Sequence, residues 1–164
     1  LCAALVLRGW RLLSDELSLV SLSDGKITPM CRPISLKNAS IDIIRQFEPT
    51  AVIGPAVHDT SKGSVAHMRA PAASVARSGE TAEPAWIIFP RYQAGADTEL
   101  KSHPKGSAFM KLAENSFNYS MLGLDGFNAA ARLVDQCTCY EFTYSRLEDA
   151  IAQFEALSSG ACCD

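Results

Sequence analysis

Hydrophobic residues recur every three to four positions in several segments, which is the spacing of one face of a helix. Positions 41, 44 and 47 are apolar in this way, so a helix is predicted from about Ser40, which could cap it, until the Glu48-Pro49 pair. The same spacing predicts further helices at 1–7, 104–118, 127–134 and 146–157.

Short apolar runs bounded by turn-forming residues predict the strands. The clearest is 85–89, Ala-Trp-Ile-Ile-Phe, and others are expected at 65–68 and 139–142. Trp10–Leu13 is predicted to be a strand that ends at the acids Asp15 and Glu16. Ser23-Asp24-Gly25-Lys26 predicts a hairpin turn. The rest of 58–84, rich in Ala, Ser, Gly, Thr, Pro and His, is predicted to be mostly loop.

Strands and helices therefore alternate, with a hairpin near the start, and this order predicts an α/β fold with a mixed sheet. The 164 residues are enough for one domain with its own core, and no repeat or internal boundary is apparent. We expect one domain over 1–157 and a disordered tail over 158–164.

The composition is that of an ordinary globular protein, with 48% hydrophobic and 20% charged residues, and a cytoplasmic location is expected. A formal charge of −3 gives no overall attraction to nucleic acid or to acidic membranes, so neither is expected as a partner. The apolar stretch at 1–7 is too short to span a bilayer and lacks the basic region of a signal peptide. A chain that begins Leu-Cys-Ala-Ala-Leu is expected to be a fragment.

The six cysteines have irregular spacing and no Cys-x-x-Cys pair. Cys137 and Cys139 could bind metal or react, but free cytosolic thiols, one or two of them buried, are the expectation. Neither Ser14 nor Ser64 lies in a nucleophile-elbow motif, which argues against a serine hydrolase.

The sharpest local feature is a helix, a glycine and a strand that ends in acids. Ligands bind at the carboxyl ends of strands in open α/β sheets, and magnesium prefers rigid carboxylate and water ligands. Asp15 or Glu16 could therefore hold magnesium, directly or through water, or one of them could take a proton from an attacking hydroxyl. Ser-Asp-Glu after an apolar run is also a common turn or helix cap.

Several cations could serve the same chemistry. Arg32 and Lys37 frame a proline-anchored loop before the helix at Ser40, and they could share a bound phosphate with it or be solvated surface charges. Lys62 and Arg69 lie in a Gly/Ser-rich stretch that could close over a transferring phosphate.

Other polar residues have simpler interpretations. Arg91, after the strand at 85–89, could reach an active site or pair with a surface acid. His58 and His67, each taken singly, are expected to form structural hydrogen bonds. Asn115 and Asn118 are expected to be caps or core hydrogen-bonding groups.

A set of motifs runs in order along almost the whole chain: Cys2-Ala3-Ala4-Leu5, Arg8-Gly9-Trp10-Arg11-Leu12-Leu13-Ser14-Asp15-Glu16, Arg32-Pro33-Ile34-Ser35-Leu36-Lys37-Asn38, Val57-His58-Asp59-Thr60, Lys62-Gly63-Ser64-Val65-Ala66-His67-Met68, Phe89-Pro90-Arg91-Tyr92 and Phe117-Asn118-Tyr119-Ser120. In these motifs the chain resembles the HprK-related kinase A group, a branch of the HPr kinase/phosphorylase superfamily.

The resemblance implies a phosphoenolpyruvate-carboxykinase-like P-loop kinase fold, truncated at the N-terminus, and phosphoryl transfer from ATP with Mg²⁺ to a protein serine. It implies that Asp15 and Glu16 match the family's second kinase motif, with Asp15 as the base or metal ligand. The expected catalytic residues are Asp15, Glu16 and Lys62, and the expected ATP-binding residues are Arg32, Lys37 and Arg69. Relatives in the superfamily form hexamers, so a homo-oligomer is possible.

The chain departs from the family in three places, the first of which is Glu16 as the second acid of the kinase motif. It contains no Gly-rich Gly-Lys-Ser/Thr loop, which in relatives precedes the residue matching Leu1, so this fragment alone is expected to be inactive. It also lacks a Glu-x-Arg-Gly-Leu-Gly signature, which argues against HPr as the acceptor and against the reverse reaction. Two alternatives remain: a non-catalytic regulatory or scaffold protein that keeps the fold, and a kinase for a small molecule.

Overall fold

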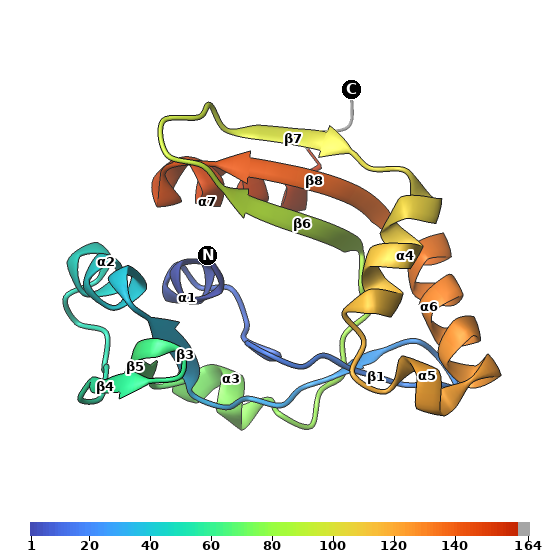
Figure 1. The fold of residues 1–164 in the computed structure, drawn as a ribbon, viewed down its shortest axis with the longest axis horizontal. Helices are drawn as coiled ribbons and strands as arrows, with labels where there is room; N and C mark the ends of the chain where they lie inside the picture. Colours follow the sequence, from blue (N-terminus) through green and yellow to red (C-terminus); the bar gives the residue numbers. More distant parts are fainter. Residues whose placement is uncertain (161–164) are drawn as a thin grey trace. The chain divides into compact units, whose positions relative to one another are not determined.

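The computed structural model describes residues 1–160, and these form two compact units. The first unit comprises Leu1–Leu19 and Thr28–Thr81, and the second comprises Val20–Ile27 and the residues from Ala82 onward. Figure 1 shows their elements in chain order. Each unit has its own sheet, so each is described separately.

The first unit is built on a small antiparallel sheet with strand order β3-β5-β4. Its strands are β3 (Ile34–Lys37), β4 (Val57–Thr60) and β5 (Gly63–Met68), and its helices are α1 (Cys2–Leu7), α2 (Ala39–Phe47) and α3 (Ala72–Ala76). In the central pairing, Ser35 lies opposite His67 and Lys37 opposite Val65.

Side-chain alternation gives this sheet one buried face. Ile34, Leu36, Ala66 and Met68 are buried, whereas the intervening Ser35, Lys37 and His67 are half-buried or exposed. Since successive side chains of a strand point to opposite faces, the polar residues share the other face. On α2, Ile41 and Ile44 are the buried residues. The helix ends at Phe47, just before the Glu48-Pro49 pair that was expected to end it.

The second unit contains a mixed sheet with strand order β6-β8-β7. β6 (Trp86–Tyr92) runs parallel to β8 (Thr138–Tyr144), and β7 (Glu99–Ser102) runs antiparallel to β8. Phe142 in the central strand is fully buried and its ring meets that of Phe154 in α7 (Leu147–Ser158). Figure 1 shows α7 along this sheet.

Three more helices complete the second unit: α4 (Lys105–Glu114), α5 (Tyr119–Leu122) and α6 (Leu124–Gln136). Ala108 of α4, Val134 of α6 and Cys139 of β8 form one buried cluster, with Ile87 and Phe89 of β6 packed against it. The short strands β1 (Leu19–Val20) and β2 (Ile27–Thr28) pair where the chain passes between the units.

The α/β class with a mixed sheet, the five helices predicted from periodicity, the strand at 85–89 and the early hairpin are confirmed. The four cysteines that the structure describes are free, and two of them, Cys137 and Cys139, are buried, in line with the expected burial of one or two.

The prediction of a strand at Trp10–Leu13 is wrong. Its backbone forms isolated hydrogen bonds to different parts of the chain. Leu12 N donates to Ser74 Oγ at 3.0 Å, and Met30 N donates to Leu13 O at 2.7 Å. No ladder forms along this segment, which belongs to none of the sheets within residues 1–160.

Two further predictions need correction. Asn38, with φ of 50°, precedes α2, and Ser40 lies inside the helix, where its hydroxyl donates to Lys37 O at 2.7 Å. The stretch 58–84 is not mostly loop, because it contains most of the β4–β5 hairpin and α3. Asn38 stabilises that hairpin by accepting from Ser64 N at 3.1 Å and donating to Lys62 O at 3.3 Å.

None of the helices within residues 1–160 is long and apolar enough to cross a membrane. At the carboxyl end, α7 extends to Ser158, so the expected tail begins inside a helix. The remainder of that expectation, from residue 161 to 164, lies outside the described residues.

Candidate functional site

The acidic segment Ser14–Glu16 is positioned by the buried residue before it. Leu12 is 2% exposed, and its amide is bound by the hydroxyl of the buried Ser74. On the other side, Leu17 N donates to Ser14 Oγ at 3.2 Å, which turns the chain. The acids therefore sit on a short turn whose start is anchored in the core of the first unit.

Asp15 is bound to the edge of the sheet. Its Oδ2 accepts a hydrogen bond from Ser35 N at 2.9 Å, and β3 is an edge strand in the order β3-β5-β4. The Lys37 amide, two residues further on, donates to Ser40 Oγ at 2.7 Å. Side chains thus satisfy amides that an edge strand leaves unpaired, and Asp15 forms a structural bond as well as carrying charge.

The amino end of α1 meets the same carboxylate. Cys2, the first residue of this helix, lies close enough to Asp15 for the charge of the carboxylate to act on its thiol. Burial and, after it, the negative charge of Asp15 raise the pKa of the Cys2 thiol to about 11. The thiol therefore stays protonated at neutral pH, beside the carboxylate that the Ser35 amide holds.

A pocket of about 330 Å³ opens beside this carboxylate. It brings together three of the residues predicted from sequence, Asp15, Glu16 and Arg32. The remaining lining residues come from the same turn, the loop before β3 and the sheet: Ser14, Leu17, Met30, Pro33, Ser35 and His67. Glu16 and Arg32 are exposed and form no ion pair among residues 1–160, so both can reach a ligand.

His67 and Ser35 are site residues whose role here is set by strand register. His67 reaches the pocket because β5 places it opposite Ser35, whose amide holds Asp15. The sequence contained His67 as a candidate, but the strand at 34–37, and hence Ser35, had no prediction. The alternation of Ile34 and Leu36 with Ser35 and Lys37 was the signal for that strand.

The other predicted cations lie outside the pocket lining. Lys37 is exposed two residues beyond Ser35 on the same strand face, about 7 Å along β3. Lys62 is exposed in the β4–β5 turn, where its amide donates to Thr60 Oγ1 at 3.1 Å. Arg69 is exposed just after β5, and its amide donates to Val52 O at 2.9 Å.

The remaining candidates form local contacts. His58 Nδ1 lies 2.8 Å from Ser64 Oγ across the β4–β5 hairpin, which is the structural hydrogen bond expected for it. Arg91 is exposed near the end of β6, in the second unit. Asn115 Nδ2 donates to Lys111 O at 2.8 Å at the end of α4, and Asn118 is the residue before α5.

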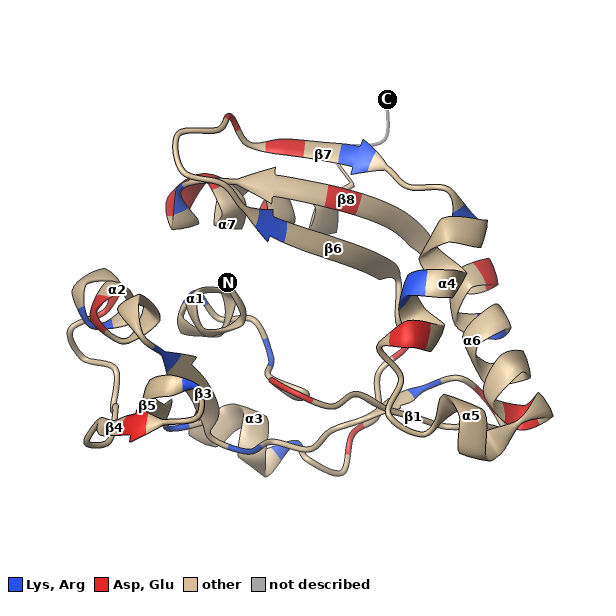
Figure 2. Cartoon of the chain, viewed as in Figure 1, with Lys and Arg blue, Asp and Glu red and all other residues tan. Residues whose placement is uncertain are grey.

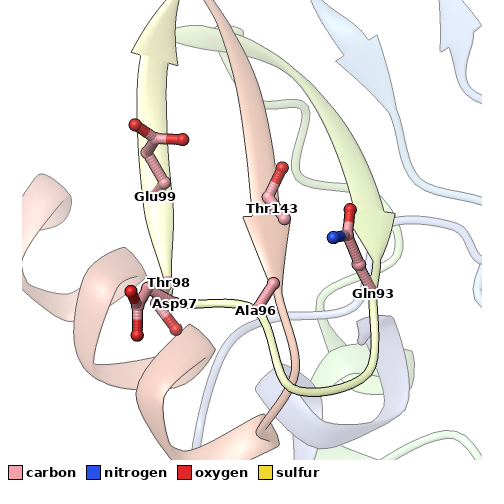
Figure 3. Close-up of a pocket in the computed structure, with 6 residues that line it drawn as sticks. All are labelled: Gln93, Ala96, Asp97, Thr98, Glu99 and Thr143. Atoms are coloured by element: carbon pink, nitrogen blue, oxygen red, sulfur yellow. The ribbon is translucent and has the colours of Figure 1, made fainter.

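The second unit has a separate pocket of about 420 Å³ around the β6–β7 connection (Figure 3). Gln93, Asp97 and Glu99 line it together with Ala96, Thr98 and Thr143. Glu99 is already paired with Lys101 at 2.8 Å, and the buried Oγ1 of Thr98 has no hydrogen-bond partner. The pocket therefore combines one acid that is already paired with a hydroxyl that has no partner.

A cluster of charged and aromatic groups lies on the sheet of the second unit. Glu141 Oε1 is 2.9 Å from Lys111 Nζ and 3.3 Å from His103 Nδ1. The hydrogen bond and charge of Lys111, followed by the charge of His103, lower the pKa of Glu141. Lys111 also lies 4.7 Å from the centroid of the Phe89 ring. Each of these charges has a partner within the cluster.

The described part of each unit contains no closed protein cage for a metal. Among residues 1–160, no three His, Cys, Asp or Glu side chains are arranged to hold an ion. Asp15 and Glu16 therefore offer a pair of carboxylates only. That arrangement suits a cation whose other ligands come from water or from a bound phosphate.

No protein-family model, no curated protein and no solved structure matches this chain.

Proposed function

We propose that this chain is the post-P-loop part of an ATP-dependent serine kinase resembling the HPr kinase/phosphorylase superfamily, with a phosphoenolpyruvate-carboxykinase-like fold. The observation that carries the proposal is the position of Asp15. Its carboxylate is oriented by Ser35 N, beside the Cys2 thiol, in a pocket that also contains Glu16 and Arg32. An oriented acid, a second acid and a free guanidinium are the groups that phosphoryl transfer needs.

The residues fit Mg²⁺ and ATP as the proposal requires. Mg²⁺ is commonly bound by one or two carboxylates together with substrate phosphates, and Asp15 and Glu16 supply that number. Arg32 would bind a phosphate oxygen, since guanidinium groups form charge-assisted bonds to phosphate. When bound, the cation neutralises charge on the phosphates.

We propose that Asp15 also takes part in proton transfer. Oδ2 is engaged by Ser35 N, which fixes the plane of the carboxylate. Asp15 would accept the proton of the acceptor's hydroxyl as that oxygen attacks phosphorus. Lys37, Lys62 and Arg69 are the proposed additional phosphate contacts from the hairpin side of the first unit.

The proposed kinase also needs a loop that holds the phosphates of ATP. The sequence contains no Gly-x-x-x-x-Gly-Lys-Ser/Thr segment, and such a loop supplies the amides and lysine that hold the β- and γ-phosphates. A phosphate-binding loop ahead of Leu1 in the complete polypeptide is therefore part of the proposal.

The test is ATP turnover by the complete polypeptide, with candidate proteins and free amino acids offered as acceptors. Asp15→Asn keeps an oxygen for Ser35 N but removes the charge, so turnover should fall by at least about 100-fold while the protein stays folded. Asp42→Asn, an exposed acid paired with Arg45 in α2, is the matched control and should retain activity. Full activity in Asp15→Asn would remove this residue from the mechanism.

A second function is favoured by the same hydrogen bonds. Because Asp15 satisfies an edge amide, it is explained equally well as a structural residue of a non-catalytic regulatory or scaffold protein. That protein would bind no ATP whether or not Asp15 is changed. Isothermal titration of the complete polypeptide with ATP and Mg²⁺ separates the two, since only the kinase gives a heat of binding.

A further inference from the structure

The helices of the second unit expose an unusual amount of apolar side chain. The exposed fraction is 57% for Met110, 90% for Phe117, 85% for Met121, 73% for Leu124 and 48% for Phe127. Single exposed hydrophobic residues are normal on any protein, whereas a group of large ones marks an interaction surface. We call these five residues the apolar patch.

The patch residues belong to α4, α5, α6 and the loop before α5, and the three helices meet through aromatic rings. The Phe109 ring lies 5.2 Å from that of Phe127 and 6.4 Å from that of Tyr119, measured between centroids. Gly126 permits the close approach, because a Cβ there would lie 2.8 Å from Tyr119 O. Figure 1 shows the three helices side by side. The exposed side chains therefore come from helices that pack against one another and from the loop before α5.

Charge is sparse in this layer. No Lys, Arg, Asp or Glu occurs in α5, which is drawn entirely without charge in Figure 2. Lys111 is occupied by Glu141, at 2.9 Å. Glu114 and Asp125 are exposed at the border of the patch, one helical turn beyond Met110 and next to Leu124 respectively. An apolar centre with a polar border is the usual organisation of a protein interface.

We propose that the apolar patch is a two-fold interface between two copies of this chain. With about 200 Å² for a large side chain, the exposed fractions of the five residues amount to about 700 Å² per copy. Two copies would bury about 1,400 Å² of patch, which lies within the range of specific interfaces. A two-fold axis lets the same residues face each other, and the flexible Met110 and Met121 can adapt to fill the contact.

The test is sedimentation velocity of the complete polypeptide over a range of concentrations. We expect a monomer–dimer equilibrium in the micromolar range. The double variant Phe117→Ser/Met121→Ser should weaken association by more than about 100-fold, because each copy loses two buried side chains. Both residues are almost fully exposed, so the variant should keep the thermal stability of the parent chain. Val52→Ser, 53% exposed in the first unit, is the matched control and should dimerise normally.

Hydrogen exchange locates the contact. In the dimer, the amides of residues 117–127 should exchange more slowly as protein concentration rises, and those around Val52 should not change. A parent chain that stays monomeric at about 100 μM would overturn the proposal. So would a dimer that survives the double variant, or protection of 117–127 that is independent of concentration, which would mean that another segment covers the patch.

Discussion

The Asp15 carboxylate accepts a hydrogen bond from the Ser35 amide at 2.9 Å, across 20 positions of sequence. This bond joins the acidic turn to the edge strand β3 and sets the position of the acid in its pocket. It also gives Asp15 a structural role that can be measured without any substrate.

Removing the Asp15 side chain should destabilise the first unit more than neutralising it. Asp15→Ala leaves the half-buried Ser35 amide without its acceptor, which should lower the free energy of unfolding by about 1–2 kcal/mol. Asp15→Asn keeps an acceptor and should cost less than half of that. Urea unfolding measures both. Equal losses in the two variants would mean that charge, and not the hydrogen bond, provides the stability.

The Cys2 thiol should react slowly while Asp15 is present. Its pKa of about 11 leaves little thiolate at mildly alkaline pH, so alkylation by iodoacetamide should be at least about tenfold slower than in the unfolded chain. Asp15→Asn removes one cause of the raised pKa and should speed the reaction. Mass spectrometry of the modified peptide distinguishes Cys2 from the other cysteines. An unchanged rate in Asp15→Asn would contradict the coupling of the two groups.

Removing the hydroxyl of Ser74 should lower the free energy of unfolding. Ser74 is 4% exposed and accepts from Leu12 N, so Ser74→Ala leaves a buried amide unpaired. We expect a loss of about 1–3 kcal/mol in the free energy of unfolding. Ser78→Ala, an exposed position two residues beyond α3, is the control and should change stability by less than about 0.5 kcal/mol. A loss as small as the control's would show that water replaces the hydroxyl.

Two glycines of neighbouring helices should respond in opposite directions to alanine. Gly126→Ala places a Cβ 2.8 Å from Tyr119 O and should cost about 1–3 kcal/mol by forcing α5 away from α6. Gly106, in the first turn of α4, has no neighbouring atom within 4 Å of the point that a Cβ would occupy, so Gly106→Ala should stabilise the helix by up to about 1 kcal/mol. Thermal unfolding compares the pair. Similar effects of the two changes would argue against the close approach of α5 and α6.

Acid should weaken the second unit partly through Glu141. Its pKa is lowered, first by Lys111 and then by His103 and Lys101, which face it from α4 and from β7 and its end. A lowered pKa in the folded state means that the contribution is complete above the ordinary value of 4.5 and is lost as pH falls through the folded pKa. Glu141→Gln should therefore lose less thermal stability than the parent chain between about pH 6 and about pH 3. The exposed Glu155→Gln should behave like the parent.

The helices and the apolar strands could be predicted from sequence because their signals are local. Ile41, Ile44 and Phe47 repeat with the period of a helix, and the bounded apolar run Ala-Trp-Ile-Ile-Phe at 85–89 is typical of a strand, whose residues from Trp86 to Phe89 are half-buried in β6. The short polar strands β3, β4 and β7 were not predicted, since four residues with two or three polar side chains resemble loop. Only pairing with β5 or β8 makes them strands.

The sequence by itself determined the residue types of the candidate site: adjacent acids at Asp15 and Glu16, and a cation at Arg32. Tertiary structure decided which of the candidates meet. It brought Ser35, His67 and Cys2 to the acids and left Lys37, Lys62 and Arg69 outside the pocket lining. The physical reason is that chain periodicity records which side of an element faces the core, whereas strand register and edge hydrogen bonds depend on partners distant in sequence.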